Sequence, residues 1–311
     1  MTRTSDIGPS VAGPIHRRRH SYAQKEQRLA IYLILPAAVA ITLVMILPLV
    51  FALVASFFQY SLGQQPVFIF LGNYIQFFQD STALRALLNT AIFTVLSLSL
   101  CIAIGVGISV LLKSLAPRQG NVLRAIFAMP ILISPIIASL IWRYMYDPTY
   151  GLVYFVLNGL GIHDFGGLTS SSTALICIVI TDVWHATPFI ILVSSAGLTV
   201  IPEELYEAAR IDGANAARTL FNITLPLLTK VLVILVLIRG TDAFRVFDLI
   251  YGLTGGGPAN STTSLSIFAY QQAYENNQMG YAMAASVVTL IALIVLFGPL
   301  MRNSARPAND F

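Results

Sequence analysis

Charged residues are scarce in this sequence, and so are cysteine and histidine. Only 10% of the 311 residues are charged, against about a quarter in ordinary soluble domains. Cys101 and Cys177 both fall inside apolar stretches and lack metal-ligand spacing, so neither a zinc site nor a disulfide framework is predicted. Of the four histidines, His16 and His20 lie four residues apart, but His163 and His185 lie far from them in the sequence, which argues against a metal-dependent hydrolase.

Motifs for nucleotide binding and nucleophilic catalysis are also missing. The phosphate-binding pattern Gly-x-x-x-x-Gly-Lys-Ser/Thr does not occur, because the dipeptide Lys113-Ser114 follows two leucines rather than the required glycines. There is no Gly-x-Ser-x-Gly elbow either. We therefore expect no catalytic residues, no bound metal and no cofactor in this chain.

Apolar residues are abundant, at 56% of the sequence, and the mean hydropathy is +0.76. Six apolar stretches each reach the roughly 20 residues that cross a bilayer as a helix, and helices satisfy their own backbone polar groups in lipid. The predicted spans are residues 29–58, 86–112, 125–146, 173–198, 231–251 and 281–301. The sequence thus predicts an all-α, polytopic membrane protein with tails at residues 1–28 and 302–311.

Lysine and arginine concentrate in alternate connections between these spans. They lie in both tails and in the connections that follow the second and fourth spans, whereas residues 252–280 contain none. Under the positive-inside rule, both termini and the connection 200–230 face the cytoplasm. The net charge of +4 therefore reflects topology in a lipid bilayer, and no nucleic-acid surface is predicted.

The connection 200–230 is the most ordered polar stretch of the sequence. Pro202 suits the first turn of a helix, and Gly213 can end that helix in the left-handed conformation. A second short helix, residues 214–222, would follow, and Pro226 would open the fifth span. The pattern predicts a helix-turn-helix on the cytoplasmic surface, with Ala208 and Ala209 small enough to let another protein approach closely.

Four charges alternate in sign at every third residue of the fifth predicted span: Arg239, Asp242, Arg245 and Asp248. A charge near the bilayer centre costs about 3 kcal/mol on insertion scales, so this helix should face protein or an aqueous cavity. Arg239–Asp242 and Arg245–Asp248 are within i,i+3 pairing reach. Mutual neutralisation inside the bundle and contact with a transported molecule both remain open.

The segment Glu207-Ala208-Ala209, with Gly213 three residues after Arg210 and Ile223-x-Leu225-Pro226 beyond it, resembles the coupling loop of the permease subunits of ABC importers. The residues that carry this expected coupling role are Glu207, Ala208, Ala209, Asp212, Gly213 and Ala214. The alternative is an ordinary surface loop in which Glu207 pairs with Arg210 or Arg218.

Further runs resemble the carbohydrate-uptake branch of these importers, typified by maltose and glycerol-phosphate importers. They are Gly72-Asn73-Tyr74, Asp242-Ala243-Phe244, Phe247–Tyr251 and Leu253–Pro258. The resemblance implies the type I importer permease fold, with six spans and a cytoplasmic coupling helix. It also implies a bacterial-type inner membrane, a second related permease subunit in a heterodimer, two ATP-binding subunits that hold ATP and Mg, and an external solute-binding protein.

The resemblance implies import of a sugar or sugar derivative. Candidate residues of the substrate pathway are Trp142, Tyr144, Arg239, Asp242, Phe244, Arg245 and Asp248. For Trp142 and Tyr144 the alternative is anchoring at the membrane interface, and for Phe244 it is core packing. A polyol, glycerol phosphate or other anionic glycoside is the alternative cargo, because the paired charges cancel. A stand-alone secondary transporter is a more distant alternative.

Overall fold

The computed structural model describes residues 32–304, so the predicted N-terminal tail and the end of the C-terminal tail lie outside the described residues. The chain divides into two units, residues 1–54 and 55–311, which are described separately. The described part of the first unit is an apolar helix that runs from Tyr32 and ends at Ala55. It contains a π-helical turn, η1 (Thr42–Ile46), followed by α2 (Leu47–Ala55), and corresponds to the first predicted span.

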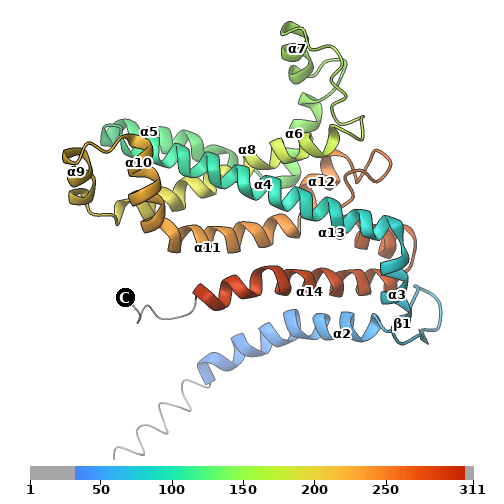
Figure 1. Cartoon of the computed structure of the whole chain (residues 1–311). Coiled ribbons are helices and arrows are strands. Elements are labelled where there is room, and N and C mark those ends of the chain that lie inside the picture. Colours follow the sequence, from blue (N-terminus) through green and yellow to red (C-terminus); the bar gives the residue numbers. More distant parts are fainter. Residues whose placement is uncertain (1–31, 305–311) are drawn as a thin grey trace, which may run out of the picture. The chain divides into compact units, whose positions relative to one another are not determined.

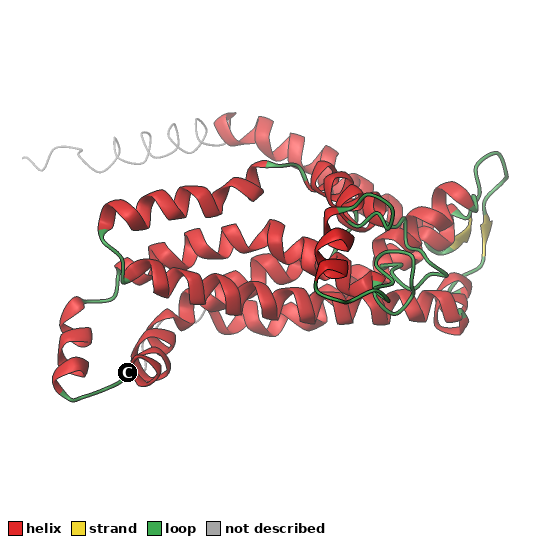
Figure 2. Cartoon of the chain, turned by 90° about the horizontal axis from the view of Figure 1, so that it is seen from above, coloured by secondary structure: helices red, strands yellow, loops and turns green. Residues whose placement is uncertain are grey.

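The second unit is nearly all helical, and its described strands form one short hairpin (Figure 2). In this hairpin β1 (Phe58–Gln59) pairs antiparallel with β2 (Val67–Phe68). The α-helices are α3 (Gly72–Gln79), α4 (Ser81–Lys113), α5 (Pro117–Ala128), α6 (Pro135–Met145), α7 (Leu152–Gly159), α8 (Ala174–Thr199), α9 (Glu203–Ile211), α10 (Ala216–Thr219), α11 (Leu225–Phe244), α12 (Asp248–Leu253), α13 (Leu265–Tyr270) and α14 (Met279–Ser304). Shorter turns are η2 (Met129–Leu132), η3 (Leu220–Thr224) and η4 (Gln271–Glu275).

Within residues 32–304, five helices are long and apolar enough to cross a membrane, or six if one bent pair counts as a single span. The bent pair consists of α5 with η2, followed by α6, and it turns by 93°. The third predicted span, residues 125–146, falls within this bent pair and contains its break. The chain breaks at Ser134, which is extended (ψ 140°), because a residue that precedes proline disfavours the helical conformation.

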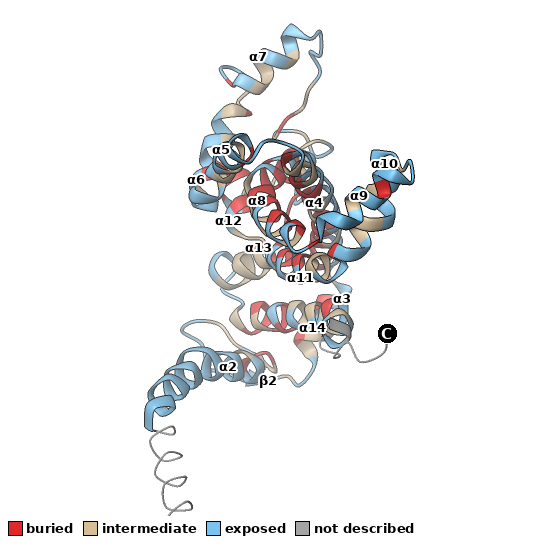
Figure 3. Ribbon diagram, turned by 90° about the vertical axis from the view of Figure 1, so that its left-hand side faces the viewer, coloured by how far each residue is buried: buried red, intermediate tan, exposed pale blue. Residues whose placement is uncertain are grey.

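The main core lies where α4, α8 and α11 run side by side (Figure 1), and buried residues concentrate on their facing sides (Figure 3). Phe93, Ile178 and Leu235 contribute fully buried side chains from these three helices. A Cβ atom at Gly105 would lie 2.6 Å from the Ile190 side chain, so this glycine permits the close approach of α4 and α8.

A second core cluster joins α3, α11, α13 and α14 at the other side of α11. Phe77 and Phe268 pack edge to face with ring centroids 6.2 Å apart, and Phe268 packs in the same way on Tyr281. Phe244, at the end of α11, is also buried in this cluster. Both clusters therefore include buried residues of α11: Leu235 and Ala243 belong to the first cluster and Phe244 to the second.

Candidate functional site

The predicted coupling residues lie on and just after α9, which is found at one end of the α4, α8 and α11 group (Figure 1). Pro202 precedes the helix in an extended conformation, and two glutamates occupy its first turn, where the positive end of the helix dipole favours anions. Gly213 ends the helix with φ +73°, and the Ala214 N–H donates to the Ala209 carbonyl at 2.9 Å. The predicted role of Gly213 as a helix end is confirmed.

The segment after Gly213 differs from the prediction. Asn215 caps α10 by accepting a hydrogen bond from the Arg218 N–H at 2.8 Å, but α10 does not form a separate helix over residues 214–222. It continues through η3 into α11, so that Ala216–Phe244 is one candidate span. Pro226 lies in the first turn of α11, as predicted, although α11 continues without a break from α10 and η3.

One side of α9 is open and carries both apolar and charged residues. Ile211 is 86% exposed and Leu205 is 41% exposed, and Glu207, Ala208 and Asp212 are exposed between them. Our sequence prediction did not include Ile211 among the coupling residues. Its position as a large apolar residue between the charged Arg210 and Asp212 could have indicated an exposed contact residue. No ion pair joins Glu207 to an arginine in the described part of the chain.

The opposite side of α9 packs on the helices of the same chain. Ala209 is only 7% exposed, so its own chain covers its side chain in this structure, and the contact that we predict with another protein falls mainly to Ala208. Consecutive helix residues are rotated by about 100°, and this rotation turns Ala209 inward while Ala208 faces outward.

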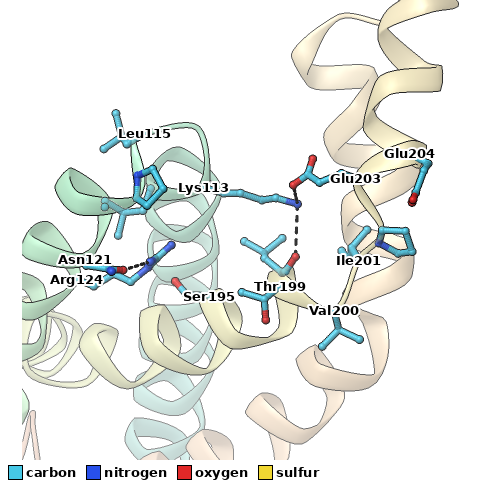
Figure 4. A pocket seen from close by; sticks show the side chains of 15 residues that line it. Lys113, Leu115, Asn121, Arg124, Ser195, Thr199, Val200, Ile201, Glu203 and Glu204 are labelled. Carbon is cyan, nitrogen blue, oxygen red and sulfur yellow. Dashed lines mark hydrogen bonds and ion pairs between the residues drawn. The ribbon is translucent and has the colours of Figure 1, made fainter.

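Lys113, the last residue of α4, holds the start of α9. Its Nζ atom lies 3.2 Å from Glu203 Oε1 and 3.9 Å from the centre of the Tyr206 ring, and it donates to the Leu198 carbonyl at 3.5 Å. Figure 4 shows Lys113 reaching across to Glu203 beside a cavity of about 570 Å³. This cavity lies between the ends of α4 and α8 and the starts of α5 and α9. Because Lys113 belongs to α4 and contacts both Leu198 of α8 and Glu203 of α9, this one lysine joins two membrane helices to the surface helix.

The charges predicted for the fifth span have different partners from those expected. Asp182 of α8 accepts hydrogen bonds from Arg239 and from Ser97 of α4, and both members of the Asp182–Arg239 ion pair are only 6% exposed. The predicted Arg239–Asp242 pair is therefore wrong. Asp242 lies about 60° around the helix from Arg239 and faces away from the core, so neutralisation of Arg239 comes from another helix.

At the far end of α11, Asp242 and Arg245 are exposed, and their side chains lie 3.4 Å apart. We predicted that Asp248 belongs to the fifth span. Instead, α11 ends at Phe244, and Asp248 is the first residue of α12. No Arg245–Asp248 ion pair forms within residues 32–304. Phe244 is 1% exposed, which assigns it to core packing and excludes it from a substrate surface in this structure.

The two aromatic candidates of α6 lie in different surroundings. Trp142 is partly buried against the core, with its ring centroid 5.5 Å from Trp184 and 5.4 Å from Tyr146. Tyr144 is 67% exposed and lies 6.4 Å from Tyr150. The seven predicted pathway residues are thus divided between buried positions and separate exposed positions, and they do not line one common pocket.

Sequence reasoning missed an aromatic cluster next to the exposed Asp242 and Arg245. The cluster consists of Phe247, Tyr251, Tyr270 and Tyr274. The Phe247 and Tyr251 rings stack with centroids 5.3 Å apart, while a hydrogen bond with Tyr251 raises the pKa of Tyr270 above its usual value. Its residues come from the start of α12, from α13 and from η4, and they meet only through tertiary packing. No local sequence pattern therefore predicts the cluster.

The sequence of this chain is similar to the sequences of known transport proteins. Residues 105–306 match the family described as "Binding-protein-dependent transport system inner membrane component". The chain is 37% identical over 276 residues to the trehalose/maltose transport system permease protein MalF of Thermococcus litoralis, which covers 87% of this chain and 91% of that protein. It is 35% identical to the trehalose transport system permease protein SugA of Mycobacterium tuberculosis, with 92% of each chain covered.

The fold also matches a solved structure. A bacterial ABC transporter involved in the import of the acidic polysaccharide alginate aligns with a TM-score of 0.81 at 21% identity, and covers 94% of this chain and 100% of that chain. At this identity the match establishes the fold alone. The prediction of an all-α polytopic importer-permease fold is confirmed by this agreement.

Proposed function

Because this chain belongs to the family of binding-protein-dependent transport system inner membrane components, we propose that it forms half of the pathway by which an ABC importer takes up a sugar or sugar derivative. The ATP and Mg would be held by two separate ATP-binding subunits, and α9 would couple ATP hydrolysis to the membrane helices. The observation that carries this proposal is the open surface of α9, mounted on the ends of the membrane helices through Lys113.

The chain connectivity supports a coupling role for α9. Three residues link the end of α8 to the start of α9, and a short turn at Gly213 leads from α9 into the long helical run of α11. A force applied to α9 by a partner therefore acts on two membrane helices directly, and on α4 through the Lys113–Glu203 ion pair. The partly apolar, partly charged outer side of α9 suits a groove in another protein.

The other partners and the orientation follow from the same proposal. A second related permease would complete the pathway, and an external solute-binding protein would deliver the sugar. The end of α14 lies at the same end of the second unit as α9 (Figure 1), which supports a cytoplasmic C-terminus. A cytoplasmic N-terminus remains a prediction from the basic residues of the first 28 positions.

The coupling proposal is tested at Ile211. Replacing Ile211 with Asp should weaken binding of the ATP-binding subunits about 10- to 100-fold, since burying an isoleucine side chain contributes about 1.5–3 kcal/mol. The measurement is the dissociation constant between the purified permease pair and its ATP-binding subunits. Ile211→Leu, which keeps an apolar side chain, is the matched control, and unchanged binding by Ile211→Asp would contradict the role of α9.

For the cargo, we propose that Asp242 and Arg245 bind sugar hydroxyls beside the aromatic cluster. Tyr251 and Tyr274 of this cluster are exposed, and exposed aromatic rings together with charged hydrogen-bonding groups are suited to a polyhydroxylated ligand. Trp142, Tyr144 and Asp248 remain candidate pathway residues. An anionic glycoside would be drawn to Arg245 and repelled by Asp242, so the pair itself does not favour an anionic cargo.

Neutralising either charge gives a direct test of this site. A hydrogen bond to a charged group contributes about 1.5–3 kcal/mol, so Asp242→Asn and Arg245→Gln should each raise KM for uptake about tenfold or more. Uptake of labelled trehalose or maltose is measured together with the membrane level of the protein. Asp164→Asn removes an exposed carboxylate elsewhere and serves as the control. A KM equal to that of the control would remove Asp242 and Arg245 from the pathway.

A further inference from the structure

A polar cavity of about 660 Å³ lies between the β1–β2 hairpin, α3 and the start of α14. The hairpin and α3, which line it, lie at the end of the second unit opposite α9 (Figure 1). Its lining consists of amide and hydroxyl side chains together with one isoleucine and one glycine, and contains no charged residue. This cavity is separate from Asp242, Arg245 and the aromatic cluster.

The hairpin wall of the cavity is held by hydrogen bonds between distant parts of the chain. The Leu62 N–H donates to Asn277 Oδ1 at 3.0 Å, and Asn277 Nδ2 donates to the Leu62 carbonyl at 3.3 Å. The Gly280 N–H donates to the Tyr60 carbonyl at 3.0 Å. A Cβ atom at Gly280 would clash with the Phe58 carbonyl oxygen, so only glycine permits this contact.

The α3 wall is fixed in the same way. Asn73 is 3% exposed, and its Nδ2 atom donates to the Ser56 and Phe58 carbonyls at 2.8 and 2.9 Å. These bonds tie the first turn of α3 to the strand that leads into the hairpin. The cavity therefore has a preformed shape, which lowers the ordering cost of binding a ligand.

Four glutamines present free amide groups in this preformed cavity. They are exposed, and their side chains make no hydrogen bond within the described part of the chain: Gln59, Gln64, Gln76 and Gln278. Each amide offers one acceptor oxygen and two donor hydrogens. This combination matches a sugar, whose hydroxyl groups both donate and accept, whereas an ionic ligand would find no opposite charge.

We propose that this cavity is an accessory binding site for a neutral oligosaccharide on the outer face of the transporter. Its volume lies within the roughly 300–1,000 Å³ of small-molecule sites. The assignment to the outer face rests on the proposed function, because it uses the orientation in which α9 faces the cytoplasm. The site would hold a sugar outside the pathway residues Asp242 and Arg245.

The test uses the complete transporter, reconstituted in nanodiscs without its external binding protein, and maltose and trehalose as probes. Saturation-transfer NMR should detect sugar binding to the wild type. The double variant Gln76→Ala, Gln278→Ala should bind at least tenfold more weakly, since it removes two amides from opposite walls. Gln79→Ala, which removes an exposed glutamine of α3 outside the cavity, should bind as the wild type does.

Two results would overturn the proposal: absence of sugar binding to the wild type, or equal binding by the wild type and the double variant. Weaker capture of the external binding protein by the double variant, with no sugar binding, would instead identify the cavity as a protein docking surface and also overturn it. The assay measures sugar binding at equilibrium and needs no ATP hydrolysis, so its outcome does not depend on the coupling role of α9. Failure of the coupling proposal and failure of the sugar site are therefore distinguishable.

Discussion

Replacing Asp182 with Ala should lower the free energy of unfolding by about 3–5 kcal/mol, the range seen when one partner of a buried ion pair is removed. The change would leave the Arg239 guanidinium buried between α4, α8 and α11 without its carboxylate. Ser97 alone cannot compensate, since its hydroxyl contributes no negative charge. Unfolding of the purified protein in mixed detergent micelles, followed by loss of helical circular dichroism, measures the effect.

Two matched variants separate the charge from the packing. The double replacement Asp182→Leu, Arg239→Met removes both charges and should recover most of the stability, because an apolar pair of similar volume often replaces a buried ion pair without loss. Asp242→Ala breaks the exposed pair with Arg245 and should cost under about 1 kcal/mol. If Asp182→Ala and Asp242→Ala lowered the free energy of unfolding equally, the buried ion pair would stabilise the protein no more than the exposed pair does.

Replacing Gly213 with Val should reduce uptake at least tenfold while the protein still inserts in the membrane. Gly213 has φ +73°, a conformation that costs an ordinary L-residue about 1–2 kcal/mol and is especially unfavourable for a β-branched residue. A Cβ atom there meets nothing within 4 Å. The loss would thus come from the altered end of α9, because there is no clash inside the chain.

Asparagine provides the control at this position. Gly213→Asn should keep most of the uptake, because asparagine enters the left-handed conformation more readily than other residues that carry a side chain. Uptake of labelled sugar is compared with the amount of each variant in isolated membranes. Full uptake by Gly213→Val at normal membrane levels would mean that the geometry of this turn has no part in coupling.

Features that depend on local composition could be predicted from the sequence. Long apolar runs must form helices in lipid wherever they lie in the chain, and the order of spans follows from them. The end of α9 at Gly213 likewise depends on the conformational freedom of one residue. Family membership also follows from a contiguous pattern around Glu207, which does not require the folded structure to be read.

Features that depend on how helices rotate against one another could not be predicted. Arg239 pairs with Asp182, which is 57 residues away along the chain. At such a separation the sequence does not indicate which carboxylate will meet Arg239. The burial of Ala209 and Phe244, and the break after Phe244 that removes Asp248 from the span, depend on the packing around them.

The sequence by itself thus determined the all-α membrane class, the importer-permease family and the turn at Gly213, because hydropathy and backbone preference act within a few residues. Tertiary structure alone decided which charges are neutralised, which face of α9 is open, and which glutamines gather in one cavity. Gln76 and Gln278 lie about 200 residues apart and meet there only because α3 and the start of α14 pack around the same hairpin.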